Sequence, residues 1–167
     1  ETHNSINAVV TVCEERARIQ IKNLNKTMHN HPGYLHGLSV VIKDLTNVKG
    51  VRTTYGSKIY KDNIPEASDF LVERIEKMGG IIIGKTNNPE FGAGSQTFNE
   101  IFGATPNPWN LEYTAGGSSG GTASALAAGA AWLGTGSDLG GSLRNPASFC
   151  GVVGIRPTAG TIAHGPE

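Results

Sequence analysis

The stretch from Gly116 to Pro146 organises the interpretation of this chain: GGSSGGTASALAAGAAWLGTGSDLGGSLRNP. It holds nine glycines in 31 residues, and most of them gather in three short groups. Glycine lets the backbone approach another backbone or a ligand closely. Glycines crowded around Ser118 and Ser142, which lie 24 residues apart, therefore indicate peptide N–H groups directed at an anionic group.

Upstream of this stretch, apolar runs predict the elements of an α/β sheet. A β-branched run at 38–42 predicts a strand with Lys43 at its end. Ser68 is a candidate N-cap for a following amphipathic helix, which Gly79 would end. Three isoleucines at 81–83 predict a second, buried strand. A helix followed by two glycines and a strand is typical of α/β architecture.

Four further elements follow from composition and spacing. Apolar residues at helical spacing predict an amphipathic helix over 6–24. The segment 122–133 is mostly small and predicts a helix packed tightly against backbone, with a short strand at 133–135. The apolar segment 148–155 is expected to enter the sheet. We therefore predict an α/β fold, a mixed β-sheet sandwiched by helices, in one domain over 1–167.

Charge and hydropathy exclude several classes of function. Fourteen basic residues balance 14 acidic ones, so no electrostatic footprint for nucleic acid or an anionic membrane is present. The longest weakly polar run, 123–133, is too short to span a bilayer. The two cysteines, Cys13 and Cys150, are far apart and favour reduced thiols in a reducing compartment. We expect a cytoplasmic protein.

Three histidines, His29, His31 and His36, surround a turn and raise the question of a metal site. Their spacing matches no established zinc pattern, and Pro32 and Gly33 between them predict a loop. We expect solvated histidines and no bound metal.

Three motifs together resemble the amidase signature hydrolases. They are GGSSGG, the segment GSDLGGSLRNPASFCGVVGIRPT and, upstream, VIKDL. The resemblance covers roughly Leu35 to the end. It implies the amidase signature fold and hydrolysis of a carboxamide C–N bond through an acyl-serine intermediate, with a small-molecule amide as substrate and no cofactor. Amidase signature enzymes are much longer, so the chain is expected to be the N-terminal portion of such a domain. Its expected partners are the remainder of the same enzyme or a second copy.

The resemblance also implies a catalytic triad. Ser142 would be the nucleophile, Ser118 a relay preceded by a cis peptide bond, and Lys43 the base. Local sequence alone leaves Lys43 open to another interpretation, an exposed charge at a strand end beside Asp44. A lysine acting as a base must be neutral, which burial achieves by lowering its pKa.

The chemistry of the residues is compatible with this triad. A serine hydroxyl needs a base to become a nucleophile. None of the five histidines lies in a recognisable nucleophile setting, and no G-x-S-x-G motif is present. A lysine acting through a second serine needs no histidine.

An oxyanion also needs preorganised hydrogen-bond donors. The natural set is the backbone N–H groups of Leu139, Gly140, Gly141 and Ser142. Asp138 and Arg144 are expected to hold this loop in place. Ser119 and Ser137 are expected to support the relay serine or the loop backbone rather than take part in the chemistry.

Other functions compete with this interpretation. GGSSGG is similar to a phosphate-binding loop, but no Gly-Lys-Ser/Thr follows it. It could also be a flexible linker, which would leave the ordered pattern after it unexplained. Within the family the alternative is the glutamine-hydrolysing component of an aminoacyl-tRNA amidotransferase. An alternative of another class is a non-catalytic fragment that binds or packs against a partner.

Overall fold

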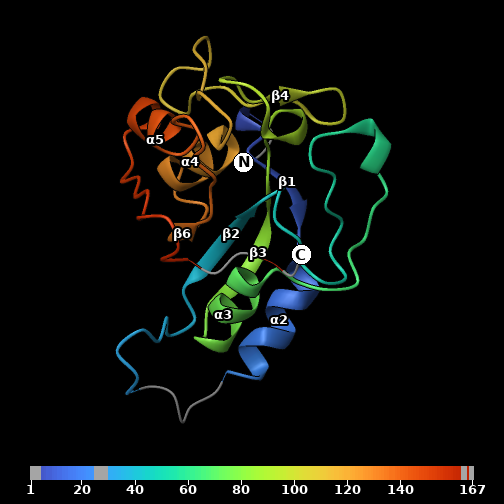
Figure 1. Ribbon diagram of the computed structural model, residues 1–167, viewed down its shortest axis with the longest axis vertical. Coiled ribbons are helices and arrows are strands. Elements are labelled where there is room, and N and C mark those ends of the chain that lie inside the picture. The colour runs from blue at the N-terminus through green and yellow to red at the C-terminus, as the bar shows by residue number, and fades with distance from the viewer. Residues whose placement is uncertain (1–4, 25–29, 163–164, 166–167) are drawn as a thin grey trace.

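A mixed β-sheet with helices on both faces forms the centre of the molecule (Figure 1). The computed structural model describes residues 5–24, 30–162 and 165, and within these the sheet has four strands in the order β1-β3-β2-β6. The strands are β1 (Val9–Val12), β2 (Ser39–Lys43), β3 (Ile81–Thr86) and β6 (Leu133–Gly134), and the helices are α2 (Glu14–Lys22), α3 (Phe70–Lys77), α4 (Gly120–Ala127) and α5 (Arg144–Cys150).

Short elements complete the described part of the chain. They are a two-stranded hairpin, β4 (Phe98–Asn99) with β5 (Gly103–Ala104), and 3-10 turns at Lys58–Tyr60 and Glu90–Gly92. In the main sheet β2 pairs in parallel with β3 and β6, whereas β1 pairs antiparallel with β3. The predicted mixed sheet between helices is thereby confirmed.

The alternation of β2 decides which side chains meet which helix. Val40 and Ile42 pack with Val72 of α3 on one face of the sheet. Val41 points to the opposite face, toward α4. A Cβ added to its neighbour Gly134 would contact the side chain of Val41 and also that of Thr122 in α4. Since successive side chains of a strand point to opposite faces, Lys43 lies on the α4 face with Val41.

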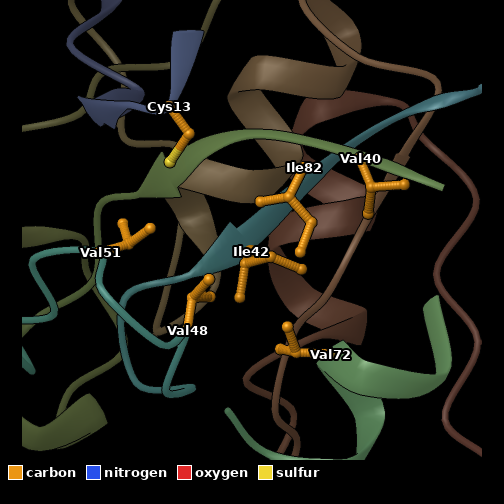
Figure 2. Close-up of a cluster of buried hydrophobic side chains, with 7 residues drawn as sticks. All are labelled: Cys13, Val40, Ile42, Val48, Val51, Val72 and Ile82. Atoms are coloured by element: carbon orange, nitrogen blue, oxygen red, sulfur yellow. The ribbon is translucent and has the colours of Figure 1, made fainter. Parts of the chain in front are cut away.

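The main hydrophobic core lies on the α3 face of the sheet. Figure 2 shows its seven buried side chains, contributed by β2, β3, α3, the start of α2 and the loop after β2. They are Cys13, Val40, Ile42, Val48, Val51, Val72 and Ile82. A smaller cluster of Ile6, Ala8 and Ala125 fills the α4 face. The two clusters together bury both faces of the sheet, as an α/β layer arrangement requires.

Helix α4 approaches other segments closely because its first turn lacks large side chains. A Cβ on Gly121 would clash with the backbone of Asn87, and one on Gly120 would clash with Thr97. The expectation of a small-residue helix packed against backbone is confirmed. The helix is shorter than predicted, beginning at Gly120 and ending at Ala127 rather than running over 122–133.

Two element predictions at the ends of the chain are wrong. The predicted helix over 6–24 is a strand, β1, followed by α2, because Val9–Val12 pairs with β3 and its β-branched residues suit a strand. The segment 148–155 does not enter the sheet. Its first part belongs to α5, which Gly151 ends at φ +70, and Val153 and Ile155 after it are exposed.

Two further boundaries differ from the sequence prediction. Asp69, not Ser68, is the N-cap of α3, and the Ser68 hydroxyl instead accepts a hydrogen bond from the Lys49 N–H at 2.9 Å. Strand β3 continues past Gly84 to Thr86, because its register with β2 extends to the pair Lys43 and Thr86. The extension brings a second lysine, Lys85, into the sheet.

Candidate active site

Lys43 is buried at the end of β2 and points into a cradle of three serine hydroxyls. Only 1% of the residue is exposed. Its Nζ lies 2.6 Å from Ser118 Oγ, 2.9 Å from Ser119 Oγ and 2.8 Å from Ser137 Oγ. None of these three partners carries a charge. Because Lys43 is buried, it is not the exposed strand-end charge that local sequence left open.

Burial lowers the pKa of Lys43 from 10.5 to about 7, because taking the ammonium out of water disfavours its charged form. The Asp138 carboxylate acts in the opposite direction and raises this pKa. A lysine with a pKa near neutrality is present in both protonation states at physiological pH. It can therefore accept a proton from a neighbouring hydroxyl.

The two residues before α4 supply two of the three hydroxyls. Ser118 and Ser119 immediately precede this helix, and both are buried. The peptide bond between Gly117 and Ser118 is cis, as the resemblance implies. The Thr97 hydroxyl donates to the Gly116 carbonyl at 2.8 Å and accepts from the Gly120 N–H at 3.0 Å. This bridge fixes both ends of the turn that presents the serines.

Threonines on neighbouring elements position the backbone of Lys43, and no motif in the sequence marks them. The Lys43 N–H donates to Thr135 Oγ1 at 3.0 Å. The Thr122 hydroxyl donates to the Thr135 carbonyl at 2.9 Å and lies 2.6 Å from Thr86 Oγ1. Local sequence carries no signal for this set, because Thr135 lies 92 residues from Lys43.

Ser142 lies beside the cradle and is half-buried. Its carbonyl accepts a hydrogen bond from the Ser119 N–H at 2.9 Å, so the two serine segments are joined through their backbones. Within the described residues the Ser142 hydroxyl makes no hydrogen bond to Ser118. The structure thus brings Lys43 and Ser118 into contact and places Ser142 next to them.

Asp138 holds the loop that carries Ser142. Its carboxylate accepts hydrogen bonds from the backbone N–H groups of Gly141 at 2.7 Å, Arg144 at 3.1 Å and Leu143 at 3.4 Å. The Arg144 guanidinium binds both carboxylate oxygens, at 2.9 and 3.0 Å. These hydrogen bonds, the Arg144 side chain foremost, hold the pKa of Asp138 far below its usual range. Asp138 and Arg144 thus both contact the loop, and their supporting role in a reaction stays a prediction.

One expectation about this loop needs correction. The sequence predicts that Gly141 offers its N–H to an oxyanion, but the Asp138 carboxylate occupies that N–H. The Arg144 guanidinium is paired with Asp138, and the charge on Asp138 raises the pKa of Lys43.

The outer side of the loop is open. Leu139 is 98% exposed, and a Cβ on Gly140 would meet no atom within 4 Å. In the described part of the chain the N–H groups of Leu139, Gly140 and Ser142 have no hydrogen-bond partner. Hydrogen bonds within the described residues therefore do not occupy these three donors.

The described residues form neither a candidate metal site nor a membrane-spanning helix. They contain no group of three or more histidine, cysteine or acidic side chains arranged to hold a metal ion. His29 lies outside the described residues, so the predicted histidine loop is described only at His31 and His36. Helices long and apolar enough for a bilayer are not found in the part of the chain that the structure describes.

The chain belongs to the amidase family: the family model described as Amidase matches residues 1–167. Among curated proteins it is 46% identical over 165 residues to a glutamyl-tRNA(Gln) amidotransferase subunit of Alkaliphilus metalliredigens (strain QYMF), covering 98% of this chain and 34% of the relative. The protein of the same name from Lachnoclostridium phytofermentans is 48% identical, with 92% of this chain and 32% of the relative covered. The chain thus spans about a third of the length of the curated relatives it matches.

Solved structures of this family share the fold. A 6-aminohexanoate cyclic dimer hydrolase complexed with substrate has a TM-score of 0.92 at 36% identity, covering 99% of this chain and 34% of its own. The corresponding glutamyl-tRNA(Gln) amidotransferase subunit from Thermotoga maritima has a TM-score of 0.74 at 35% identity, covering 90% and 36%. The similarity includes enzymes named for different substrates.

Proposed function

We propose that this protein hydrolyses the C–N bond of a carboxamide through an acyl-serine intermediate, with Ser142 as nucleophile, Ser118 as relay and Lys43 as base. The observation that carries the proposal is the contact of 2.6 Å between Lys43 Nζ and Ser118 Oγ inside a buried cradle without a carboxylate. Membership of the amidase family and the near-neutral pKa of Lys43 support it.

The proton path follows from counting donors and acceptors around Lys43. A neutral amine has two N–H donors and one lone pair, so one of its three hydroxyl partners must donate to it. The Ser119 hydroxyl donates to the Ser137 carbonyl at 3.4 Å, which leaves Ser119 as an acceptor from Lys43. Ser118 and Ser137 remain as candidate donors to the amine, and Ser118 is the nearer of the two, at 2.6 Å against 2.8 Å.

In the proposed acylation, Ser142 Oγ attacks the amide carbon while its proton passes to Ser118, and Ser118 passes its own proton to Lys43. The relay requires the Ser142 hydroxyl to come within hydrogen-bond reach of Ser118; catalytic hydrogen bonds commonly tighten only when substrate is bound. When the C–N bond breaks, the same path returns a proton to the leaving amine. Water then attacks the acyl-serine, releasing the acid and restoring Ser142.

The oxyanion of the tetrahedral intermediate would bind to the N–H groups of Leu139, Gly140 and Ser142. Gly141 is left out of this set because its N–H is bound to Asp138. Loss of one such donor in a serine hydrolase raises the barrier by about 3 to 4 kcal/mol. The loop is preorganised by Asp138, so its donors need no reorientation during the reaction.

A second candidate function is glutamine hydrolysis within an aminoacyl-tRNA amidotransferase. The curated relatives at 46% and 48% identity carry the name of such an enzyme, which favours this candidate. In that case the ammonia released from glutamine would pass to a partner protein. The proposed serine chemistry is the same, and only the substrate and the fate of ammonia differ.

The test uses the protein expressed from its complete coding sequence. A fluorophosphonate probe should label Ser142, identified by peptide mass spectrometry, and Ser142→Ala should abolish that labelling. Turnover is then measured on acetamide, benzamide and L-glutamine. Hydrolysis of simple amides supports a free-standing amidase, and ammonia release from glutamine alone supports the amidotransferase. A folded protein with neither labelling nor turnover would identify a non-catalytic binding role.

A further inference from the structure

A second lysine, Lys85, is fully buried in the sheet and takes no part in the cradle of Lys43. It lies on β3 beside Ile42, whereas Lys43 pairs with the next residue, Thr86. Side chains one residue apart along a strand point to opposite faces. Lys85 therefore lies on the α3 face of the sheet and Lys43 on the α4 face.

The partners of Lys85 differ in kind from those of Lys43. Its Nζ lies 3.1 Å from Asp44 Oδ1, 2.8 Å from the Thr46 carbonyl and 2.6 Å from Thr53 Oγ1. The Thr53 hydroxyl donates to the Val51 carbonyl at 3.2 Å, so it acts as an acceptor from Lys85. The Thr46 carbonyl and the engaged Thr53 hydroxyl accept hydrogen bonds from Lys85, and the Asp44 carboxylate forms an ion pair with it, a set of partners that suits an ammonium.

Two opposing effects act on the charge of Lys85. Burial lowers its pKa, and the paired Asp44 carboxylate raises it. A buried ion pair of this kind is expensive to desolvate, so its presence calls for a role beyond stability. The hydrogen bonds around Asp44 show what the pair holds.

Asp44 ties the loop after β2 to the sheet. Its second carboxylate oxygen accepts hydrogen bonds from the Thr54 N–H at 3.0 Å and the Thr54 hydroxyl at 2.6 Å. Its backbone carbonyl accepts from the Tyr55 N–H at 3.1 Å. Together with the Thr46 and Thr53 contacts of Lys85, these bonds fix both ends of the segment 44–56 against β3.

The segment 44–56 contacts the 90–92 turn, which packs against the proposed relay serine, Ser118. The Tyr55 carbonyl accepts a hydrogen bond from the Phe91 N–H at 2.7 Å. Tyr55 at φ +53 and Phe91 at φ +51 both adopt left-handed backbone, which non-glycine residues keep only where their surroundings fix it. The next residue, Gly92, packs against the cradle, since a Cβ there would lie 3.6 Å from Ser118 Oγ.

We propose that Lys85 is a positioning residue for the reaction: its ion pair with Asp44 fixes the segment 44–56, which through Tyr55 and Phe91 holds the 90–92 turn against Ser118. The inference rests on the proposed role of Ser118 as relay. Lys43 remains the group that exchanges the proton, and Lys85 acts only through its contacts with Asp44 and the segment 44–56.

The experiment uses variants that keep the site buried and folded. In Lys85→Met/Asp44→Leu both charges are replaced by apolar groups, a change that buried pairs tolerate better than loss of one partner. Thr54→Val leaves the ion pair in place and removes the hydroxyl that donates to Asp44 and accepts from the Gly56 N–H. Lys61→Met, at an exposed lysine that follows the segment 44–56, is the matched control.

Two quantities are measured in the protein expressed from its complete coding sequence. The first is the rate of fluorophosphonate labelling of Ser142 against pH, and the second is amide hydrogen exchange in peptides covering 53–56 and 90–92. A displacement of about 1 Å in a catalytic group can cost about a hundredfold in rate. We expect labelling to slow by about tenfold to a hundredfold in the double variant, and by less in Thr54→Val. The pH midpoint should stay unchanged, exchange at both peptides should be faster, and the control should match wild type.

Several results would overturn the inference. One is wild-type labelling and exchange in the folded double variant; another, if the double variant does not fold, is wild-type behaviour of Thr54→Val. If the pH profile of Ser142 labelling lost its midpoint in the double variant, Lys85 itself would be the titrating group. That result would also contradict the inference. Absence of labelling in wild type would refute the proposed function instead, and hydrogen exchange would then decide the positioning of the 90–92 turn alone.

Discussion

The Nζ atom of Lys43 lies 2.6 Å from the Oγ atom of Ser118, although 75 residues separate them in the sequence. The contact exists because β2 alternates its side chains and α4 covers the face to which Lys43 points. Burial of that face takes the ammonium out of water and moves its pKa to about 7. The fold therefore produces both the hydrogen bond and the lowered pKa on which the proposed chemistry depends.

Stability should depend on pH through Lys43. Its pKa of about 7 in the folded protein lies below the ordinary 10.5, so the unfolded chain binds more protons between these two values. The free energy of unfolding of wild type, relative to Lys43→Met, should therefore rise as pH increases from about 7 to about 10.5, while below about 7 the burial cost is fully present. Urea denaturation of both proteins across this range measures the difference. A difference independent of pH would show that the lysine is not perturbed.

Ser119→Ala should lower the pKa of Lys43 further. The substitution removes one of the three acceptors of the ammonium. A hydrogen bond to a charged group contributes about 1.5 to 3 kcal/mol, so the shift should be about one pKa unit or more. The measurement is the midpoint of the pH profile of Ser142 labelling. Ser124→Ala is the control, because this buried α4 serine bonds the Pro106 carbonyl at 3.2 Å and does not touch Lys43. Equal midpoints in the two variants would contradict the cradle.

Asp138→Asn should slow labelling of Ser142 by about tenfold or more while the protein stays folded. The amide cannot accept from three backbone N–H groups and the Arg144 guanidinium at once, so the loop over 138–142 loses its fixed shape. The charge on Asp138 raises the pKa of Lys43, so the midpoint should also move to lower pH. Asp62→Asn, at an exposed aspartate, controls for loss of charge. Unchanged labelling would remove Asp138 from the positioning of Ser142.

Gly121→Ala should destabilise the fold. A Cβ at this position would clash with the backbone of Asn87, which cannot move away without shifting the end of β3. Overpacking of this kind costs about 1 to 3 kcal/mol or more. Gly33→Ala is the matched control, because its Cβ would lie 3.4 Å from the flexible end of Met78 and in ordinary contact with the His31 ring at 3.7 and 3.8 Å, without a clash. Chemical denaturation compares the two, and equal stabilities would show that α4 is not held as tightly as the structure indicates.

The central elements could be predicted from local sequence because pattern and packing agree there. The β-branched run at 38–42 forms β2, and the amphipathic segment after Asp69 forms α3. At the N-terminus they disagree. The spacing of apolar residues over 6–24 fits a helix, but pairing of Val9–Val12 with β3 satisfies their backbone groups across the sheet, and no local pattern reports that pairing.

The candidate site was predictable to the extent that motifs mark it. Family resemblance predicted Lys43, Ser118 and Ser142 as the triad, whereas local sequence alone left open an exposed Lys43. Neither reveals that Asp138 occupies the N–H of Gly141, since this depends on how the loop turns back on itself. The contacts of Thr135 and Thr97 also escape prediction, because threonines carry no motif and their partners lie far away in sequence.

The measurement that tests the account most directly is the rate of fluorophosphonate labelling of Ser142 against pH, in wild type and in Lys43→Ala. If Lys43 is the base, the wild-type rate rises with pH through an ionisation near 7, the pKa of the buried lysine. Lys43→Ala should lose that ionisation and most of the rate, by about a hundredfold or more, while keeping its circular dichroism spectrum. Labelling of Lys43→Ala at the wild-type rate, or a wild-type profile that rises only near the ordinary lysine pKa of 10.5, would contradict the account.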